Sequence, residues 1–504
     1  MREKRTFEIS QRSGPMTVQH IFVLMLENRS FDHMFAFSNI PGIKVATAAD
    51  TNSFGGQTYT FQPGAPDLMP SDPSHGFAAV VQQLCGEGSD PNKVSPYPAR
   101  TKSGFVADYS KTKIKKKPLP KAAYGKIMMG IDTATQAPAL FALASEYALC
   151  DNWFASLPGP TWPNRFFVHG ASSDGMCKSP SLGDIAKWEV FKGFTYPNGS
   201  IYDRLGKGSY RLYQDKSGPI AGRIPQVAAI KGIDYGDVAG LDSFEKDLKK
   251  GKAARYTFIE PAYGDIVSGS YGRGSSQHPM DGLRSGDNLI ARVYNAIRKS
   301  PVWEKSLLIV TYDEHGGFFD SAVPSAKAAP PNDGTGAGQN THGFDFAEFG
   351  VRVPAVIVSP QIAKGTVDHT LFDHASVLAT VEQAFALAPL TDRDKAAKSV
   401  LPLLTQAAPF DANRLPELPI APPPPAPMAA ASVPAPADPS EPIEQAADLP
   451  GFLYVARKSQ RKRQGDLQAM TAFQPVRTRA DAQAYLDAVM PQLEAARIKK
   501  AGGA

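Results

Sequence analysis

Short apolar runs rich in β-branched residues alternate with helical patterns over the first 415 residues. The clearest runs are Ile21–Leu26, Tyr256–Ile259, Leu307–Tyr312 and Ala355–Ser359. Each has the length of a buried strand, and strands that alternate with helices are typical of a mostly parallel sheet with helices on both faces. The pattern predicts an α/β fold with three α/β/α layers.

A different pattern marks the C-terminal part. Residues Pro416–Pro442 contain eleven prolines interleaved with alanines, a composition that forms neither a packed core nor a regular helix. Farther on, Thr478 and Asp481 have the spacing of a capping box, and apolar residues then follow at helical spacing. The sequence therefore predicts a catalytic domain over 1–415, a Pro/Ala-rich linker over 416–446, and a basic tail with one short amphipathic helix over 447–504.

Composition narrows the class of protein. Of the 504 residues, 42% are hydrophobic and 20% are charged, as in ordinary globular proteins. No apolar run is long enough to cross a bilayer, and residues 1–20 lack the apolar stretch of a signal peptide. The expected location is the cytoplasm as the sequence is written, or the periplasm or the exterior if its start is misassigned.

The net charge of +5 is unevenly distributed. Residues 447–504 hold ten Lys/Arg and five Asp/Glu, which leaves 44 of each sign for residues 1–446. A neutral body argues against a nucleic-acid partner, which would need a basic face on the main domain. The tail could make a peripheral contact with a membrane, and the lysine-rich segment Lys111–Lys117, if not simply a solvated loop, could gather anionic headgroups. The oligomeric state is left open.

Polar residues follow three of the predicted strands directly. Glu27 and Asn28 follow the first strand, Glu260 follows the second, and Asp313 and Glu314 follow the third. Ligands in open α/β sheets bind beyond the carboxyl ends of the strands, so these side chains should converge. The oxygens of Glu27, Asn28, Asp313 and Glu314 suit one divalent cation, with Ca²⁺, Mg²⁺ or Mn²⁺ favoured over Zn²⁺. One such pair alone would more simply cap a helix or face solvent, whereas two pairs favour a metal site.

A proline-rich turn offers a nucleophile. Thr161 lies within Pro158–Arg165, just ahead of a predicted helix whose N-terminal N–H groups favour an anion. The simpler reading is a threonine that only caps this helix. Histidines could supply positive charge and a proton for attack on phosphorus. The candidates are His75, His278, His315 and His374, although a lone histidine is more often structural.

Four ordered segments resemble one family. They are Glu27–His33, Gly159–Arg165, Tyr312–Gly317 and Gly350–Pro354, spread over about residues 18–390. The chain is similar to the bacterial phosphoesterase family of non-specific (phosphatidylcholine-type) phospholipases C and related acid phosphatases, within the alkaline-phosphatase-like superfamily. The resemblance implies an alkaline-phosphatase-like fold.

The resemblance also implies roles for individual residues. The metal would be held by Glu27, Asn28, Thr161, Asp313 and Glu314, with Thr161 also the nucleophile. The histidines around the phosphate would be His75, His278 and His315. On the substrate side, where the chain departs from the family pattern, we assign contacts to Asn164, Asp287 and His374.

The expected activity is metal-dependent hydrolysis of phospholipid phosphodiesters through a phosphothreonine, as in a phospholipase C. A phosphomonoesterase of the acid-phosphatase type would use the same residues on a small phosphate ester. A catalytically silent phospholipid-binding protein is a more distant alternative, disfavoured because nucleophile and ligands are all present. No G-x-S-x-G segment occurs, which disfavours a serine lipase.

Overall fold

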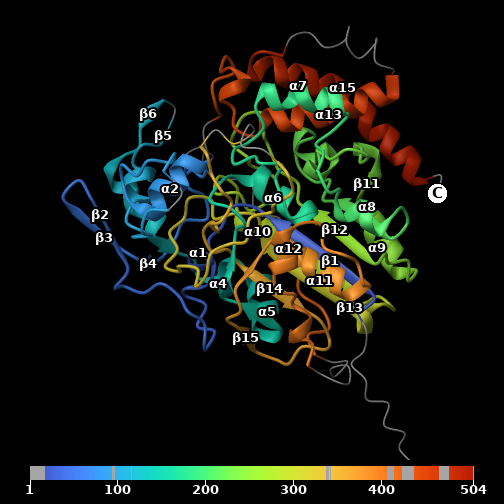
Figure 1. Ribbon diagram of the computed structural model, residues 1–504, viewed down its shortest axis with the longest axis horizontal. Coiled ribbons are helices and arrows are strands. Elements are labelled where there is room, and N and C mark those ends of the chain that lie inside the picture. The colour runs from blue at the N-terminus through green and yellow to red at the C-terminus, as the bar shows by residue number, and fades with distance from the viewer. Residues whose placement is uncertain are drawn as a thin grey trace, which may run out of the picture.

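A computed structural model describes residues 18–93, 97–114, 116–335, 340, 342–405, 414–422, 436–464 and 476–502. An eight-stranded sheet runs through the middle of the molecule (Figure 1). In spatial order its strands are β11 (Val238–Gly240), β10 (Tyr210–Gln214), β12 (Tyr256–Glu260), β1 (His20–Leu26), β13 (Ser306–Tyr312), β14 (Ala355–Val358), β8 (Ala148–Cys150) and β15 (Thr366–Asp368).

The sheet is mostly parallel. Strand β1 lies between β12 and β13 and pairs in parallel with both, whereas β14 runs antiparallel to β13 and β8. Every residue of β13 and all of Ile21–Leu26 are buried. Because successive side chains of a strand point to opposite faces, both faces of the sheet must be covered. The predicted three-layer α/β class and the four predicted strands are confirmed.

Two groups of helices provide the cover. In one group, α10 (Leu283–Arg298) packs against α5 (Pro138–Glu146) and α9 (Leu241–Lys249). In the other, α6 (Thr161–Gly170) packs against α11 (Ala375–Phe385) and α8 (Ile201–Leu205), and α11 packs against α12 (Asp392–Ala396). Helix α6 begins with Thr161, the predicted nucleophile.

A lobe between β1 and α5 forms the blue and cyan side of Figure 1. It contains the β2–β3 hairpin (Thr51–Phe54 and Gln57–Thr60), α2 (Phe77–Cys85), α3 (Phe105–Tyr109) and the β5–β6 hairpin (Lys113–Ile114 and Lys117–Pro118). His75 lies just before α2, so this lobe brings a candidate catalytic histidine to the sheet.

The C-terminal segment packs on the body instead of standing apart. Helices α13 (Leu449–Gln464) and α15 (Arg479–Gly502) contact each other, and α13 contacts α7 (Leu182–Phe191). Phe452 and Leu486 are buried within the main core. The tail over 447–504 is therefore in contact with the main core, and the division at residues 415 and 446 remains a prediction. Residues 423–435 of the predicted linker lie outside the described residues.

The tail also contains more helix than predicted. The capping box is confirmed, because the Asp481 N–H donates to Thr478 Oγ1 at 3.2 Å and the Thr478 N–H donates to Asp481 Oδ2 at 3.0 Å. The helix that follows has 24 residues, so it is not short. Helix α13 was not predicted.

Basic side chains of the tail pair with the body. Arg457 lies 2.8 Å from Glu189 of α7, and Lys500 lies 2.5 Å from Asp237. Lys458 Nζ donates to the carbonyls of residues 228, 230 and 233. These contacts engage three of the ten basic side chains of the tail with the body, and the membrane contact of the tail stays a prediction. Among the described helices, none combines the length and apolar composition needed to cross a bilayer.

Candidate active site

The strand-end acids converge as expected. Because β1 lies beside β13, the Asn28 N–H donates to Asp313 Oδ1 at 3.1 Å. Asn28 adopts a left-handed backbone with a φ of 60°, which turns the chain directly after β1. Glu27, Asn28, Asp313 and Glu314 are all at least 97% buried. Residues 285 positions apart in the sequence thus meet at one edge of the sheet.

Thr161 lies at this edge as the first residue of α6. Its side chain is buried, and Oγ1 lies 3.5 Å from Asn28 Oδ1. The turn before it is held by Asn164, whose amide nitrogen donates to the carbonyls of residues 157, 159 and 160 and whose oxygen accepts from the Leu157 N–H. The amide of Asn164 is thus occupied in fixing the nucleophile turn, and its substrate contact stays a prediction.

Arg165 is a site residue that the sequence analysis missed. Its Nε donates to Asp313 Oδ2 at 2.9 Å, and its Nη2 donates to the carbonyls of Met25 and Leu26. Its Nη1 is buried and has no hydrogen-bond partner. The signal was present, because a residue four positions after Thr161 lies on the same face of a helix.

His75 lies near Glu314 because the chain segments that carry them pack closely. Its Nδ1 lies 3.8 Å from Glu314 Oε1. Gly317, with a φ of +75°, packs so closely that a Cβ would lie 2.7 Å from Pro73. Glycine is required in this backbone conformation and at this approach. Burial alone would lower the pKa of His75, but the Glu314 and Asp72 carboxylates raise it above the ordinary value.

His278 lies beside His75 with its ring edge-on, at 6.1 Å between centroids. Its Nδ1 accepts from the Met280 N–H at 3.3 Å, so in the neutral ring Nε2 carries the hydrogen. Nε2 is buried without a hydrogen-bond partner and lies 3.9 Å from Asp72 Oδ1. Burial and the positive charges of His75 and Arg29 lower the pKa of His278 well below the ordinary value.

A residue of the first motif, Arg29, holds the loop that carries His278. Arg29 donates to the carbonyls of Gln277, His278 and Asp281 at 2.7–3.2 Å. Arg352, from the fourth motif, bridges Asp32 and Asp320 at 2.9 Å each. Arg29 and Arg352 thus hold segments around the site in place.

His315 and His374 contact the predicted metal ligands Glu314 and Asp313, and their predicted roles at the phosphate and the substrate stay predictions. Nε2 of His315 donates to Gln83 Oε1 at 2.7 Å, and its Nδ1 lies 3.2 Å from Glu314 Oε2. Nε2 of His374 donates to the Asp313 carbonyl at 2.6 Å, and its Nδ1 accepts from Trp153. Both rings thus position the neighbouring acids.

Asp287 lies on α10 and caps another helix. Its two carboxylate oxygens accept from the N–H groups of Ala139 and Leu140, each at 2.9 Å, at the start of α5. The structure thus gives Asp287 a capping role, and its substrate contact stays a prediction. Burial raises the pKa of Asp287 to about 6, and the two backbone N–H groups oppose that shift.

Several atoms of the site fit a cation. Glu27 Oε2 and Glu314 Oε1 are buried without a hydrogen-bond partner, an arrangement that costs free energy unless a cation or water binds there. Burial raises the pKa of Glu27 well above the ordinary value despite Arg165. Against this, the oxygens of Asp313 are engaged, and across the described ranges no three His, Cys, Asp or Glu side chains stand in a ready metal-ligand group.

The C-terminal segment contributes one further acid. Asp448, directly before α13, is 5% exposed and accepts from Ser179 Oγ at 2.7 Å. Its charge acts on Glu27, Asp72 and His75. No local pattern in the sequence indicated this, because Asp448 comes from beyond the proline-rich segment.

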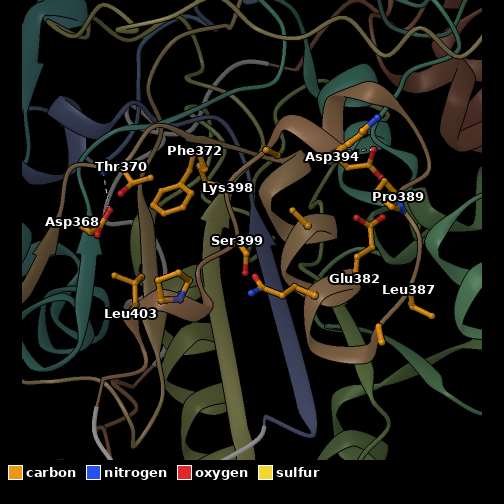
Figure 2. A pocket seen from close by; sticks show the side chains of 16 residues that line it. Asp368, Thr370, Phe372, Glu382, Leu387, Pro389, Asp394, Lys398, Ser399 and Leu403 are labelled. Carbon is orange, nitrogen blue, oxygen red and sulfur yellow. Dashed lines mark hydrogen bonds between the residues drawn. The ribbon is translucent and has the colours of Figure 1, made fainter. Parts of the chain in front are cut away.

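A cleft of about 1030 Å³ reaches this region. Its lining includes Asp72, Lys111, Lys113, Lys116, Met280 and Arg479. Asp72 connects the cleft to His278. Figure 2 shows a separate hollow of about 640 Å³ beside α11, where Glu382 and Asp394 lie close together. None of the acids or histidines described above, nor Thr161, lines that second hollow.

Comparison with known proteins identifies the class. The chain is 31% identical over 439 residues to Non-specific phospholipase C3 of Arabidopsis thaliana, covering 81% of this chain and 78% of that protein. It is 25% identical over 431 residues to Phospholipase C B of Mycobacterium tuberculosis, covering 73% and 74%. The protein is a hydrolase acting on phosphoric ester bonds. The model of the Phosphoesterase family matches residues 18–388, so the chain belongs to that family.

Similarity to solved structures is weaker. A protein of the alkaline phosphatase superfamily from Vibrio parahaemolyticus aligns with a TM-score of 0.31 and 12% identity, over 52% of this chain and 64% of that one. Phosphonate Monoester Hydrolase of Agrobacterium radiobacter aligns with a TM-score of 0.29 and 13% identity, over 53% and 72%. Values this low add nothing to the argument from the sheet and the family.

Proposed function

We propose that this protein hydrolyses phospholipid phosphodiesters as a metal-dependent phospholipase C, through a phosphothreonine at Thr161. The observation that carries the proposal is the buried Thr161 hydroxyl, 3.5 Å from Asn28 Oδ1 at the edge where Glu27, Asp313 and Glu314 meet. A hydroxyl at the start of a ten-residue helix faces N–H groups that stabilise an anion.

Thr161, His278 and His75 each have a part in the proposed reaction. The Thr161 hydroxyl gives its proton to water, its Oγ attacks phosphorus, and the bond from phosphorus to the alkoxide of the leaving group breaks. His278 donates its Nε2–H to a phosphate oxygen, since Nδ1 is already occupied by the Met280 N–H. His75 is placed to protonate the leaving oxygen, and water then hydrolyses the phosphothreonine.

Glu27, Asn28, Thr161, Asp313 and Glu314 would hold the cation. A bound divalent ion would lower the pKa of the Thr161 hydroxyl and neutralise charge on phosphate oxygens. Arg165 positions Asp313, and His315 positions Glu314. Oxygen donors favour Ca²⁺, Mg²⁺ or Mn²⁺ over Zn²⁺.

Two observations support a phospholipid over a small monoester. The relatives described above are named phospholipases C, and the adjoining cleft of about 1030 Å³ is larger than a simple phosphate ester requires. Lysines at its rim suit an anionic phosphate group.

A direct comparison of substrates tests the proposal. The enzyme, supplied with a divalent cation, is assayed on phosphatidylcholine and on p-nitrophenyl phosphate. We expect release of diacylglycerol, with kcat/KM at least tenfold higher for the lipid. A preference for p-nitrophenyl phosphate would instead indicate a phosphomonoesterase, and turnover of neither ester would overturn the proposal.

A further inference from the structure

Helix α7 exposes an apolar surface to solvent. The exposed fractions are 40% for Leu182, 75% for Val190 and 58% for Phe191. Half of the exposed large apolar side chains in the described part of the chain belong to this one helix, and the others are scattered over three separate segments. A cluster of this kind on a protein surface marks an interaction site, whereas single exposed apolar residues do not.

Basic side chains lie beside this surface, and one carboxylate, that of Asp174, interacts with Lys187. Lys187 and Lys192 are exposed beside it. Glu189 faces the body, where it pairs with Arg457 at 2.8 Å and Arg461 at 3.7 Å. The outer face of α7 thus combines apolar side chains with lysines, as in helices that lie in the interface of an anionic membrane.

The inner face of α7 is firmly anchored. Ser181 and Asp184 form a complete capping box at its start. Trp188 is buried, and the Tyr454 hydroxyl donates to its carbonyl at 3.0 Å. These contacts therefore hold the helix in place with Val190 and Phe191 exposed to solvent.

Packed side chains connect α7 to the segment that carries the nucleophile. Trp188 packs on Trp162 with 6.2 Å between ring centroids, and Trp162 directly follows Thr161. In Figure 1, α7 lies at the top of the molecule beside α13 and α15. A membrane under α7 would therefore lie close to the reaction centre.

We propose that the outer face of α7, formed by Leu182, Lys187, Val190, Phe191 and Lys192, docks on an anionic lipid surface. Val190 and Phe191 insert between headgroups, and the lysines contact lipid phosphates. The inference rests on the proposed function, because a lipid-cleaving enzyme has to reach substrate in a bilayer. Lysines beside apolar side chains select the lipid surface over a second copy of this chain, whose matching face would carry the same charge.

The test compares vesicle binding in two variants. In Val190→Ser/Phe191→Ser the apolar contact is removed, and Ile420→Ser is a matched control because Ile420 is 55% exposed elsewhere. Co-sedimentation with vesicles of phosphatidylcholine and phosphatidylglycerol should be at least tenfold weaker for the double variant and unchanged for the control. Hydrolysis of soluble bis(p-nitrophenyl) phosphate and the Tm should match the wild type.

A charge variant tests the second component. Lys187→Gln/Lys192→Asn should bind vesicles of phosphatidylcholine alone like the wild type and bind the anionic vesicles more weakly. Asparagine is suitable because Lys192 has a left-handed φ of 60°. The difference should shrink in high salt.

Three outcomes would overturn the docking surface. They are absence of wild-type binding to anionic vesicles, undiminished binding by the serine variant, and a change in oligomeric state without a change in vesicle binding, which would mark an interface between copies. Since binding is measured without turnover, failure of the phosphoesterase assay would leave this result intact. If the wild type hydrolysed phospholipid without binding vesicles, α7 would be rejected as the docking surface, whereas the proposed function would stand.

Discussion

His278 holds a buried Nε2–H that has no hydrogen-bond partner and lies 3.9 Å from Asp72 Oδ1. The Met280 N–H fixes the tautomer, and burial keeps the ring neutral by lowering its pKa. A neutral imidazole stabilises a phosphate oxygen better than it protonates an alkoxide.

His278→Ala should lower kcat by about 10²–10³ on esters with good and with poor leaving groups alike. The measurement is kcat for a p-nitrophenyl and an alkyl phosphodiester, with metal content as the control. A loss confined to the alkyl ester would instead make His278 the general acid.

Glu27→Gln should weaken metal binding, because it removes a charged oxygen from the proposed ligand set while keeping the shape of the side chain. Metal content of the purified variant and reactivation by added cation measure the effect. Glu304→Gln, at an exposed glutamate, is the control. Full metal content in Glu27→Gln would remove Glu27 from the ligand set.

The residues that the sequence located correctly are those set by local pattern. Acids directly after β-branched runs must lie at strand ends, and parallel strands bring those ends together. The contacts that it did not predict depend on distant partners. His315 is held by Gln83, 232 positions earlier, and Asp287 is occupied by the start of α5. Nothing near these residues in the sequence encodes those contacts.

Helix α13 shows the same limit for a whole element. Its sequence ends in a basic run of the tail, and no helix was predicted there, yet its apolar residues pack on the nucleophile helix. Phe452 is 1% exposed, with its ring 5.4 Å from Trp162 and 5.1 Å from Tyr263. A Cβ on Gly451 would lie 2.4 Å from Trp162, so the helix fits there only with glycine.

Phe452→Ala should destabilise the protein by about 3–5 kcal/mol, because it removes a buried ring from this contact. Activity on a soluble phosphodiester should fall as well, since Trp162 adjoins Thr161. Thermal unfolding and kcat measure the two effects, with the exposed Ile498→Ala as control. An unchanged Tm together with full activity would show that the tail is dispensable.

The molecule as a whole buries many carboxyl groups, and one of them makes its stability depend on pH. Burial, with the adjacent Asp394, raises the pKa of Glu382 to about 9, against 4.5 for an ordinary glutamate. The folded state therefore keeps a proton that the unfolded chain releases above pH 4.5. The stability that this proton contributes is full below about pH 4.5 and is lost as the pH rises towards 9.

Glu382→Gln should remove this dependence, because glutamine keeps an uncharged amide at all pH values. The Tm of the variant minus that of the wild type should grow from pH 5 to pH 9. Glu304→Gln serves again as the exposed control. A difference that stays constant across this range would contradict the burial of an uncompensated carboxyl group at residue 382.

Trapping of the covalent intermediate tests the nucleophile most directly. Enzyme supplied with a divalent cation is mixed with bis(p-nitrophenyl) phosphate, quenched in acid and analysed by peptide mass spectrometry. Attack by Thr161 releases one p-nitrophenolate and leaves a p-nitrophenyl phosphoryl group on its Oγ. We predict that this adduct lies on the Thr161 peptide and that Thr161→Ala shows neither adduct nor turnover while keeping a wild-type Tm. An adduct on another residue, or turnover by Thr161→Ala, would contradict the account.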